Sequence, residues 1–559
     1  MPSIEVSSED MQRLLDSKLT IDELSDLVAY AKCTIDAVNG DTLKLAVKDT
    51  NRPDLWSAEG IAREIRFRTR KPGLPRYRFR NSSVRVNVDR SVHRVRPYTV
   101  CTSVTDLELD QFSLSQMIQL QEKVAVSFGK NRREIAIGVY DLDKIKAPIK
   151  YTTVDPDGIQ FVPLDFKEKL TPREILEKHP KGREFGQLLA GADRYPMFID
   201  SAGEVLSIPP IINSDYTGKV TEDTRNVFIE CSGFALRTLS TALNVVSTAL
   251  AERGAVIEKI TVQYPNTRIV TPDLSPKTAY LKLQYLNRLS GLQLSMPQAC
   301  RLLRKSGYDV SHTGQRIRVL YPSYRQDIMH ERDLIEDLLI SYGYDKIPPV
   351  RPKLPTVGKG SEIEDFSNLC SRILIGLGFQ ETMSYILTNK SNQFEKMNLK
   401  EGDAIELENP ASSNWNVFRS WLLPCVMEFL SNNLHVEYPQ RVFEIGDVVI
   451  SDESVETRAR DLRKMVCALS NSSVSYEEIS PILDALFSAL GMKYELTPKE
   501  HPSFIEGRAA AVRSLGEEIG FIGEINPQVL ESWRIEAPVA AFELDVNQML
   551  KSLLTLGKI

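Results

Sequence analysis

The sequence predicts a chain of several α+β domains. Its 559 residues are enough for about three to five domains, each with its own core. Short β-rich segments alternate with amphipathic helices along the chain, which predicts mixed domains, and the turn-rich segment TPDLSP at residues 271–276 marks a boundary. A hydrophobic content of 42% and a charged content of 26% are typical of a soluble globular protein.

Cysteine usage and hydropathy indicate where the chain works. The seven cysteines are scattered and form no C-x-x-C pair, which argues against a disulfide framework and a zinc ribbon. The amino terminus lacks a basic segment followed by an apolar core, and no apolar run approaches the roughly 20 residues that cross a bilayer. We therefore expect a cytoplasmic protein with no membrane partner.

The net charge of −6 hides one strongly basic stretch. Between Arg63 and Arg96 lie eleven arginines and one lysine against two acids, a local balance of +10. Such a stretch fits a nucleic-acid backbone, an exposed linker or a surface facing an acidic partner, and the sequence leaves all three open.

Residues 1–85 are predicted to form a small α/β module. Helices are expected at residues 7–15 and 21–31, and a strand at TLKLAV, residues 42–47. The segment Asn51-Arg52-Pro53-Asp54 has the composition of a turn, and Ser57 is placed to cap the helix that follows.

Residues 86–265 are predicted to form an α+β domain. Strands are expected at VRVNV, YTVCTSV, IAIGVY and IKYTTV, with helices at 115–128 and 171–178. Two further strands, 197–200 and 205–208, flank the turn SAGE and lead to a polar loop at Asn213 and Ser214. Such side chains can line a cleft, although capping and turn formation explain them equally well.

Residues 268–352 are predicted to form helices, a short hairpin and a final acidic helix, a winged-helix-like order. The last helix has apolar residues at three- and four-residue spacing and ends at Gly343. Asp333, Glu336 and Asp337 lie on its opposite face, and Asp327 lies just upstream. Mg²⁺, neighbouring arginines or plain solvent would each offset these charges.

Two long motifs connect these segments to a known family. R-x-D-I-x-x-x-x-D-L-I-E-D at 325–337 precedes G-Y-D-x-I-P-P, and N-R-P-D-x-x-S-x-x-G-I-A-R-E occupies 51–64. Together they resemble the phenylalanyl-tRNA synthetase beta subunit. In that family four such acids bind magnesium, which implies Mg²⁺ on Asp327, Asp333, Glu336 and Asp337.

The resemblance implies that residues 86–265 are an editing domain of the archaeal and eukaryotic type, which hydrolyses tyrosine wrongly attached to tRNA(Phe). An apolar synthetic pocket rejects an isostere with an added hydroxyl only about 10²-fold, so a second site is needed. Its expected lining residues are Asn213, Ser214, Asp223, Thr224 and Glu230. No histidine lies within residues 195–233, so hydrolysis is expected to depend on positioned water and oxyanion donors.

Residues 356–559 resemble the antiparallel-sheet core of a class II synthetase. A predicted helix through Phe366, Leu369, Ile373 and Leu377 precedes a strand, as in the first class II motif. The arginines that clamp ATP in the second and third motifs are missing, because RVFEIG and AAFELDV stand in their places. This domain is therefore expected to be non-catalytic.

The resemblance implies an α₂β₂ heterotetramer in which the alpha subunit joins L-phenylalanine to tRNA(Phe) with ATP. This chain would be the beta subunit and would supply proofreading. One alternative is a scaffold and tRNA-docking subunit whose middle domain is inert. A magnesium-dependent phosphoryl-transfer enzyme is a third possibility, but no phosphate-cradling G-x-x-x-x-G-K-[S/T] loop occurs.

Overall fold

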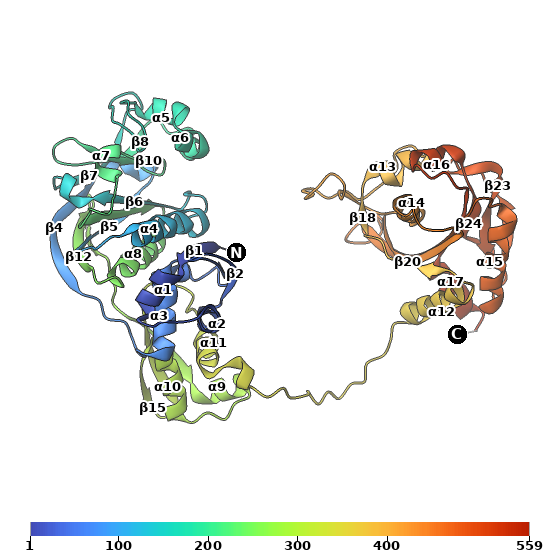
Figure 1. Cartoon of the computed structure of the whole chain (residues 1–559), viewed down its shortest axis with the longest axis horizontal. Helices are drawn as coiled ribbons and strands as arrows, with labels where there is room; N and C mark the ends of the chain where they lie inside the picture. The colour runs from blue at the N-terminus through green and yellow to red at the C-terminus, as the bar shows by residue number, and fades with distance from the viewer. Residues whose placement is uncertain (1, 558–559) are drawn as a thin grey trace. The chain divides into compact units, whose positions relative to one another are not determined.

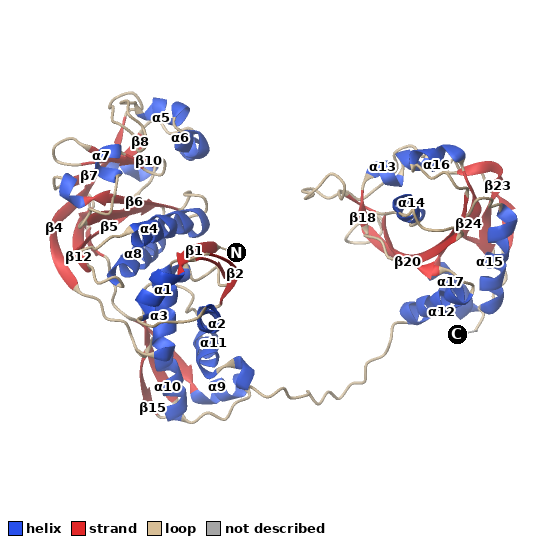
Figure 2. Cartoon of the chain, in the orientation of Figure 1, coloured by secondary structure: helices blue, strands red, loops and turns tan. Residues whose placement is uncertain are grey.

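The computed structural model describes residues 2–557, which form two compact units, residues 1–350 and 351–559 (Figure 1). The first unit contains three separate sheets, and the second is built on one large sheet (Figure 2). The multidomain α+β class predicted from the sequence is confirmed. The four predicted domain boundaries stay predictions. Among the described residues no helix is long and apolar enough to cross a membrane.

The first sheet lies at the amino terminus. Its three strands, in the order β1-β3-β2, are antiparallel and pack against three helices. The elements are β1 (Ser3–Ser7), α1 (Ser8–Leu15), α2 (Ile21–Val28), β2 (Cys33–Asn39), β3 (Thr42–Val47) and α3 (Ala58–Thr69). The predicted strand at 42–47 and the Ser57 cap are both confirmed, since Ser57 Oγ accepts a hydrogen bond from the Gly60 amide.

The second and largest sheet has ten strands. Nine of them follow the order β10-β9-β8-β7-β4-β12-β5-β11-β6, and β13 pairs with β12. The strands are β4 (Phe79–Val88), β5 (Tyr98–Thr105), β6 (Ile135–Asp141), β7 (Ile149–Val154), β8 (Tyr195–Ile199), β9 (Val205–Ile208), β10 (Ile212–Asn213), β11 (Val227–Gly233), β12 (Val256–Gln263) and β13 (Arg268–Thr271).

Helices cover this sheet on one face and at one end. The apolar side of α8 (Leu236–Ala251) packs on β5 and β11, with α4 (Gln111–Lys123) beside it (Figure 2). Three short helices, α5 (Pro172–Lys178), α6 (Pro180–Phe185) and α7 (Asp215–Gly218), lie near β8 to β10. The sheet curls, so that Asn213 on β10 donates a hydrogen bond to the carbonyl of Val139 on β6.

The third sheet belongs to the segment predicted to be winged-helix-like. Its order is β14-β16-β15, and three helices close its core. The elements are β14 (Lys277–Lys282), α9 (Leu283–Ser290), α10 (Met296–Lys305), β15 (Asp309–Thr313), β16 (Arg316–Tyr321) and α11 (Glu331–Tyr342). The helix α11 ends at Gly343, as predicted.

The second unit is built on a seven-stranded sheet with the order β17-β20-β21-β25-β24-β23-β22, antiparallel except where β17 pairs with β20. Helices pack on both faces. The sheet strands are β17 (Gln380–Glu381), β20 (Gln440–Ser451), β21 (Ala459–Ser470), β22 (Glu495–Pro498), β23 (Phe504–Ser514), β24 (Glu517–Ile525) and β25 (Val539–Asp545).

The remaining elements of this unit are six helices and a two-stranded sheet. They are α12 (Glu362–Gly376), β18 (Leu387–Thr388), α13 (Lys390–Gln393), β19 (Val417–Phe418), α14 (Leu423–Asn432), α15 (Tyr476–Ala489), α16 (Pro527–Ser532) and α17 (Val546–Thr555). The predicted long helix through Phe366 is α12, and its apolar side packs with α15 and α17.

Candidate functional site

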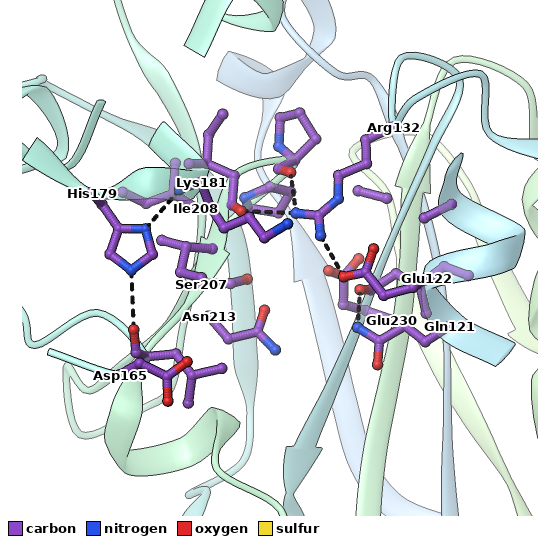
Figure 3. Close-up of a pocket in the computed structure, with 18 residues that line it drawn as sticks. Gln121, Glu122, Arg132, Asp165, His179, Lys181, Ser207, Ile208, Asn213 and Glu230 are labelled. Carbon is purple, nitrogen blue, oxygen red and sulfur yellow. Dashed lines mark hydrogen bonds and ion pairs between the residues drawn. The ribbon is translucent and has the colours of Figure 1, made fainter. Parts of the chain in front are cut away.

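A cavity of about 230 Å³ lies where the two ends of the ten-stranded sheet approach each other (Figure 3). Strand β9 and the turn into β10 form one wall, and α4, β6 and β11 form the other. Its volume is below the roughly 300–1,000 Å³ of sites for drug-sized ligands. A cavity of this size suits one small group, such as an amino-acid side chain.

Glu230 on β11 is the ionisable group at the base of this cavity. It is only 2% exposed, and its Oε1 accepts a 3.3 Å hydrogen bond from the Tyr140 hydroxyl. Its Oε2 has no hydrogen-bond partner among the described residues. Burial raises the pKa of Glu230 to about 8, and the Arg96 guanidinium offsets this only in part. Glu230 is therefore largely a neutral acid at neutral pH.

Tyr140 fixes the neighbours of this carboxyl. Its buried hydroxyl lies 2.7 Å from Ser207 Oγ and 3.3 Å from Glu230 Oε1, and its single proton is shared between these two oxygens. Gly138 makes room for it, because a Cβ at that position would lie 2.0 Å from the Tyr140 hydroxyl oxygen. Ser207 and Glu230, from β9 and β11, both line the cavity. The sheet thus places a hydroxyl and an uncharged carboxyl side by side in an enclosed space.

His179 also lines the cavity, but it is not a free base. Its Nδ1 accepts a hydrogen bond from the Lys181 amide, and its Nε2 lies 3.1 Å from the Leu164 carbonyl (Figure 3). The ring also packs on Phe166 at 4.7 Å between centroids. Both nitrogens are thus engaged, and His179 caps helix α6.

The structure brings two of the five predicted pocket residues to the cavity, Asn213 and Glu230. Ser214 instead caps α7, where its Oγ accepts from the Thr217 amide. Thr224 is buried in a turn and its Oγ1 accepts from the Thr221 amide, while Asp223 is exposed. These three remain predictions as pocket residues, and their observed contacts are those of caps and turns.

Three residues that sequence reasoning missed line the cavity: Ser207, Arg132 and His179. Ser207 lies inside the predicted strand 205–208, whose residues are all buried, and its position there carries no functional signal. Arg132 and His179 come from segments far from residues 195–233. Only the curling of the sheet brings them to the same place.

The acidic residues of the predicted magnesium site have partners within the protein. The Arg325 guanidinium, 3% exposed, donates to both oxygens of Asp327 at 2.8 and 2.5 Å and to Asp337 Oδ2 at 2.7 Å. The Tyr308 hydroxyl also donates to Asp337. Burial raises the pKa of Asp327, but Arg325 outweighs that effect and the pKa is lowered. Both acids are therefore paired with Arg325.

The other two acids point to different partners. Asp333 Oδ2 accepts from the amides of Met329 and His330 at 2.7 and 2.6 Å, which caps α11. Glu336 Oε1 lies 2.6 Å from Lys32 Nζ of the amino-terminal module. Within residues 2–557 no three His, Cys, Asp or Glu side chains are arranged to hold a metal ion. The arrangement seen does not fit Mg²⁺.

The second long motif, residues 51–64, contacts the same charged cluster around Arg325 and Asp327. Arg52 binds Asp54 through two hydrogen bonds of 2.9 and 2.7 Å and reaches Glu64 at 3.1 Å, with all three side chains buried. Arg52 also lies 3.8 Å from Asp327. The two motifs therefore form one buried charge network that joins the amino-terminal module to the loop before α11.

The basic stretch splits into buried and exposed members. Arg63, Arg68 and Arg96 are buried, and Arg96 donates to the Ser232 carbonyl at 2.6 Å. Most of the others are exposed on β4 and its flanking segments. The buried arginines therefore stabilise the fold. For the exposed ones, a nucleic-acid contact, an exposed linker and a surface facing an acidic partner all stay open.

In the second unit, charged residues in the segments where class II motifs were expected have partners within the protein. Arg419 donates to Glu444 at 2.6 Å, and Glu543 Oε2 accepts from the Leu422 and Leu423 amides at the start of α14. Cluster residues such as Trp421 and Trp533 fill one face of the sheet.

Comparison with known proteins identifies the class. Three family descriptions match the chain in succession: a B3/4 domain over residues 108–261, a tRNA synthetase B5 domain over 280–344 and a phenylalanyl-tRNA synthetase beta chain CLM domain over 347–546. They place the chain among the aminoacyl-tRNA synthetase polypeptides.

Relatives that align along nearly their whole length identify the family. The phenylalanine–tRNA ligase beta subunit of Pyrococcus horikoshii is 49% identical over 97% of this chain and 99% of its own length. That of Thermococcus sibiricus is 46% identical over 99% of both. A crystal structure of an amino-terminal fragment of the P. horikoshii phenylalanyl-tRNA synthetase beta subunit is 50% identical, with a TM-score of 0.60 over 61% of this chain and all of the fragment. The chain belongs to the phenylalanine–tRNA ligase beta subunits.

Proposed function

We propose that this chain hydrolyses tyrosine from mischarged tRNA(Phe) in the cavity between β9 and β11, as the beta subunit of a phenylalanine–tRNA ligase. The observation that carries the proposal is Glu230, a buried carboxyl in the cavity whose Oε2 has no partner among the described residues. An unpaired buried polar atom costs about 1–3 kcal/mol, so a rearrangement of the carboxyl that gives Oε2 a partner from the cavity would recover that free energy.

The chemistry of the cavity suits a phenol. Ser207 and Glu230 offer uncharged hydroxyl and carboxyl groups, which exchange hydrogen bonds with a phenol hydroxyl without desolvating a charge. A site built to hydrogen-bond a hydroxyl rejects the analogue that lacks it by about 10⁴–10⁵-fold. Phenylalanine would leave these groups unpaired, so tyrosine is selected.

Hydrolysis breaks the ester bond between the tyrosyl carbonyl carbon and the ribose oxygen of the tRNA. Water adds to the carbonyl carbon, the ribose oxygen leaves with a proton, and tyrosine is released. No free histidine or metal cluster is available in the described cavity. The contribution of the site is therefore to position the ester and the water, which can supply about 7–11 kcal/mol.

Deacylation of Tyr-tRNA(Phe) by the assembled ligase tests this proposal. Glu230→Ala and Asn213→Ala should each lower kcat/KM, whereas Asp193→Ala, at an exposed position outside the cavity, should not. Unchanged activity in both cavity variants would favour the inert scaffold.

We further propose that the second unit supports an alpha subunit that performs ATP-dependent charging, within an α₂β₂ assembly that binds tRNA(Phe). Arg419 and Glu444 are paired with each other, so neither is free to bind ATP. Phenylalanine-dependent ATP–pyrophosphate exchange by this chain alone should be absent and should appear when the alpha subunit is added. Exchange by the isolated chain would refute this division of work.

Magnesium binding by Asp327, Asp333, Glu336 and Asp337 stays a prediction. Binding there would require Arg325 to release two carboxylates and Lys32 to release Glu336. ATP remains a substrate expected of the assembled ligase.

A further inference from the structure

We propose that Arg132 is a positioning residue that holds the two ends of the ten-stranded sheet together across the cavity and so sets the width of the pocket. The inference rests on the proposed deacylation function. Arg132, which lies in the loop after α4, would thereby control which aminoacyl ester the pocket accepts.

The two ends of the sheet are not joined by a ladder of backbone hydrogen bonds. Among the described strands β10 pairs only with β9, and β6 pairs only with β11. The distance across the cavity therefore depends on side chains. Three side-chain contacts cross it: Asn213 bonds to the Val139 carbonyl at 3.3 Å, Tyr140 on β6 bonds to Ser207 on β9 at 2.7 Å, and Arg132 reaches the β9–β10 turn. Of these, only Arg132 also reaches α4 and α6.

The Arg132 guanidinium contacts three different elements. Its Nη1 donates to the carbonyls of Pro210 and Ile211 at 3.2 and 2.9 Å, and its Nη2 donates to Glu122 Oε1 on α4 at 2.7 Å (Figure 3). Its central carbon lies 4.3 Å from the ring centroid of Phe185 on α6. Only a planar fork of donors meets all these partners at once, so lysine is no substitute.

The backbone around Arg132 is held in an unusual conformation. Lys130, Asn131 and Arg132 have φ angles of 51°, 53° and 63°, so three successive non-glycine residues are left-handed. A π-helical turn, Val124–Phe128, precedes them. Such strain persists only where surrounding contacts fix it, and it concentrates at functional sites. Here the amides of residues 130–132 bond to the carbonyls of residues 125–127, Arg96 donates to the Arg132 carbonyl, and the guanidinium contacts of Arg132 add to these.

Loss of this bridge should widen the pocket. Glu122, Pro210 and Ile211 all line the cavity, so each group that Arg132 holds is part of the wall. Misplacing a reacting group by about 1 Å costs about 10²-fold in rate. A wider pocket also brings Ser207 and Glu230 out of register with a phenol, which weakens discrimination between tyrosine and phenylalanine.

The test compares Arg132→Gly with Lys130→Gly in the assembled ligase. Glycine adopts positive φ without strain, so neither substitution forces the loop to refold. Lys130 is exposed and lies outside the cavity lining, which makes it the matched control. We expect Arg132→Gly to lower kcat/KM for tyrosyl-tRNA by about 10²-fold and to reduce the tyrosine-to-phenylalanine ratio. Lys130→Gly should leave both unchanged.

Two further measurements separate positioning from stability. Added ethylguanidinium should partly restore Arg132→Gly, whereas Arg132→Lys, which keeps the charge but not the fork, should stay impaired. Amide hydrogen exchange at Ile212 and Asn213 should speed up in Arg132→Gly and not in Lys130→Gly.

Equal deacylation and equal discrimination in Arg132→Gly and the parent would overturn the inference while leaving the proposed function intact. Unchanged exchange at Ile212 and Asn213 would overturn it as well. A parent ligase without deacylation activity would instead defeat the proposed function, and the exchange measurement would then still report whether Arg132 joins the sheet ends.

Discussion

Glu230→Gln should remove a pH dependence from the stability of the ten-stranded sheet. The folded protein raises the pKa of this carboxyl from 4.5 to about 8, because burial disfavours its ionised form. Between pH 4.5 and about pH 8, Glu230 keeps its proton in the folded state but has lost it in the unfolded state. Stability from this group is therefore complete below about pH 4.5, falls as pH rises, and is lost once pH passes about 8.

The size of the effect follows from the same values. Each pH unit between 4.5 and 8 costs about 1.4 kcal/mol, so ionised Glu230 destabilises the fold by at most about 5 kcal/mol. Glutamine has nearly the same shape and does not titrate. The free energy of unfolding of Glu230→Gln should therefore approach that of the parent at pH 5 and exceed it by several kcal/mol at pH 9.

Hydrogen exchange of the β11 amides at pH 5, 7 and 9, corrected for intrinsic exchange rates, measures this local stability. Hydrogen exchange reports the local stability of this sheet separately from the stability of the second compact unit. Asp223→Asn, at an exposed site, serves as the control and should follow the parent at every pH. If Glu230→Gln and the parent lost protection equally between pH 5 and 9, Glu230 would be ionised in the folded protein at neutral pH and the reasoning would fail.

Three more outcomes are expected. Arg325→Ala leaves two carboxylates without their shared partner and should destabilise the first unit by about 3–5 kcal/mol, measured by chemical denaturation; a change below 1 kcal/mol would contradict the pairing. EDTA should leave the melting temperature of the parent protein unchanged, and a lower melting temperature in EDTA would show that the parent holds a resident ion. In contrast, Mg²⁺ should stabilise Arg325→Ala, because Asp327 and Asp337 are then free to bind it. Gly138→Ala should displace the Tyr140 hydroxyl, cost about 1–3 kcal/mol and reduce deacylation, and normal activity would show that this hydroxyl does not order the site.

Local patterns predicted most of the elements of the fold. The strands 42–47, 149–154 and 205–208 have the predicted bounds, because alternation and flanking turn residues define both ends. Ser57 caps α3 and Gly343 ends α11 as expected, since capping depends only on neighbours in the chain. The curl of the ten-stranded sheet was not predictable in this way, because it depends on packing between distant segments.

The candidate site was predictable only in part for the same reason. Asn213 and Glu230 were expected in the pocket because of the resemblance to the editing domain, and both line the cavity. Ser207 has the sequence context of an ordinary strand residue, and Arg132 lies about sixty positions before residues 195–233. Their roles follow from strand order and from the approach of β10 to β6, which a single sequence does not encode locally.

The two groups of acids in the first unit illustrate how pairing separates structural from functional charge. Around Arg325, every carboxylate has a cation or amide partner, and burial is offset by those contacts. At Glu230 the nearest cation, Arg96, is committed to Ser232 and the 132–133 carbonyls, so the carboxyl stays uncompensated and takes up a proton. Burying an acid without a cation beside it is costly, since a neutral side chain would cost less. Glu230, which has Tyr140 on one oxygen and no partner on the other, is therefore the candidate for substrate contact that we propose, and the paired acids indicate where two parts of the fold are joined.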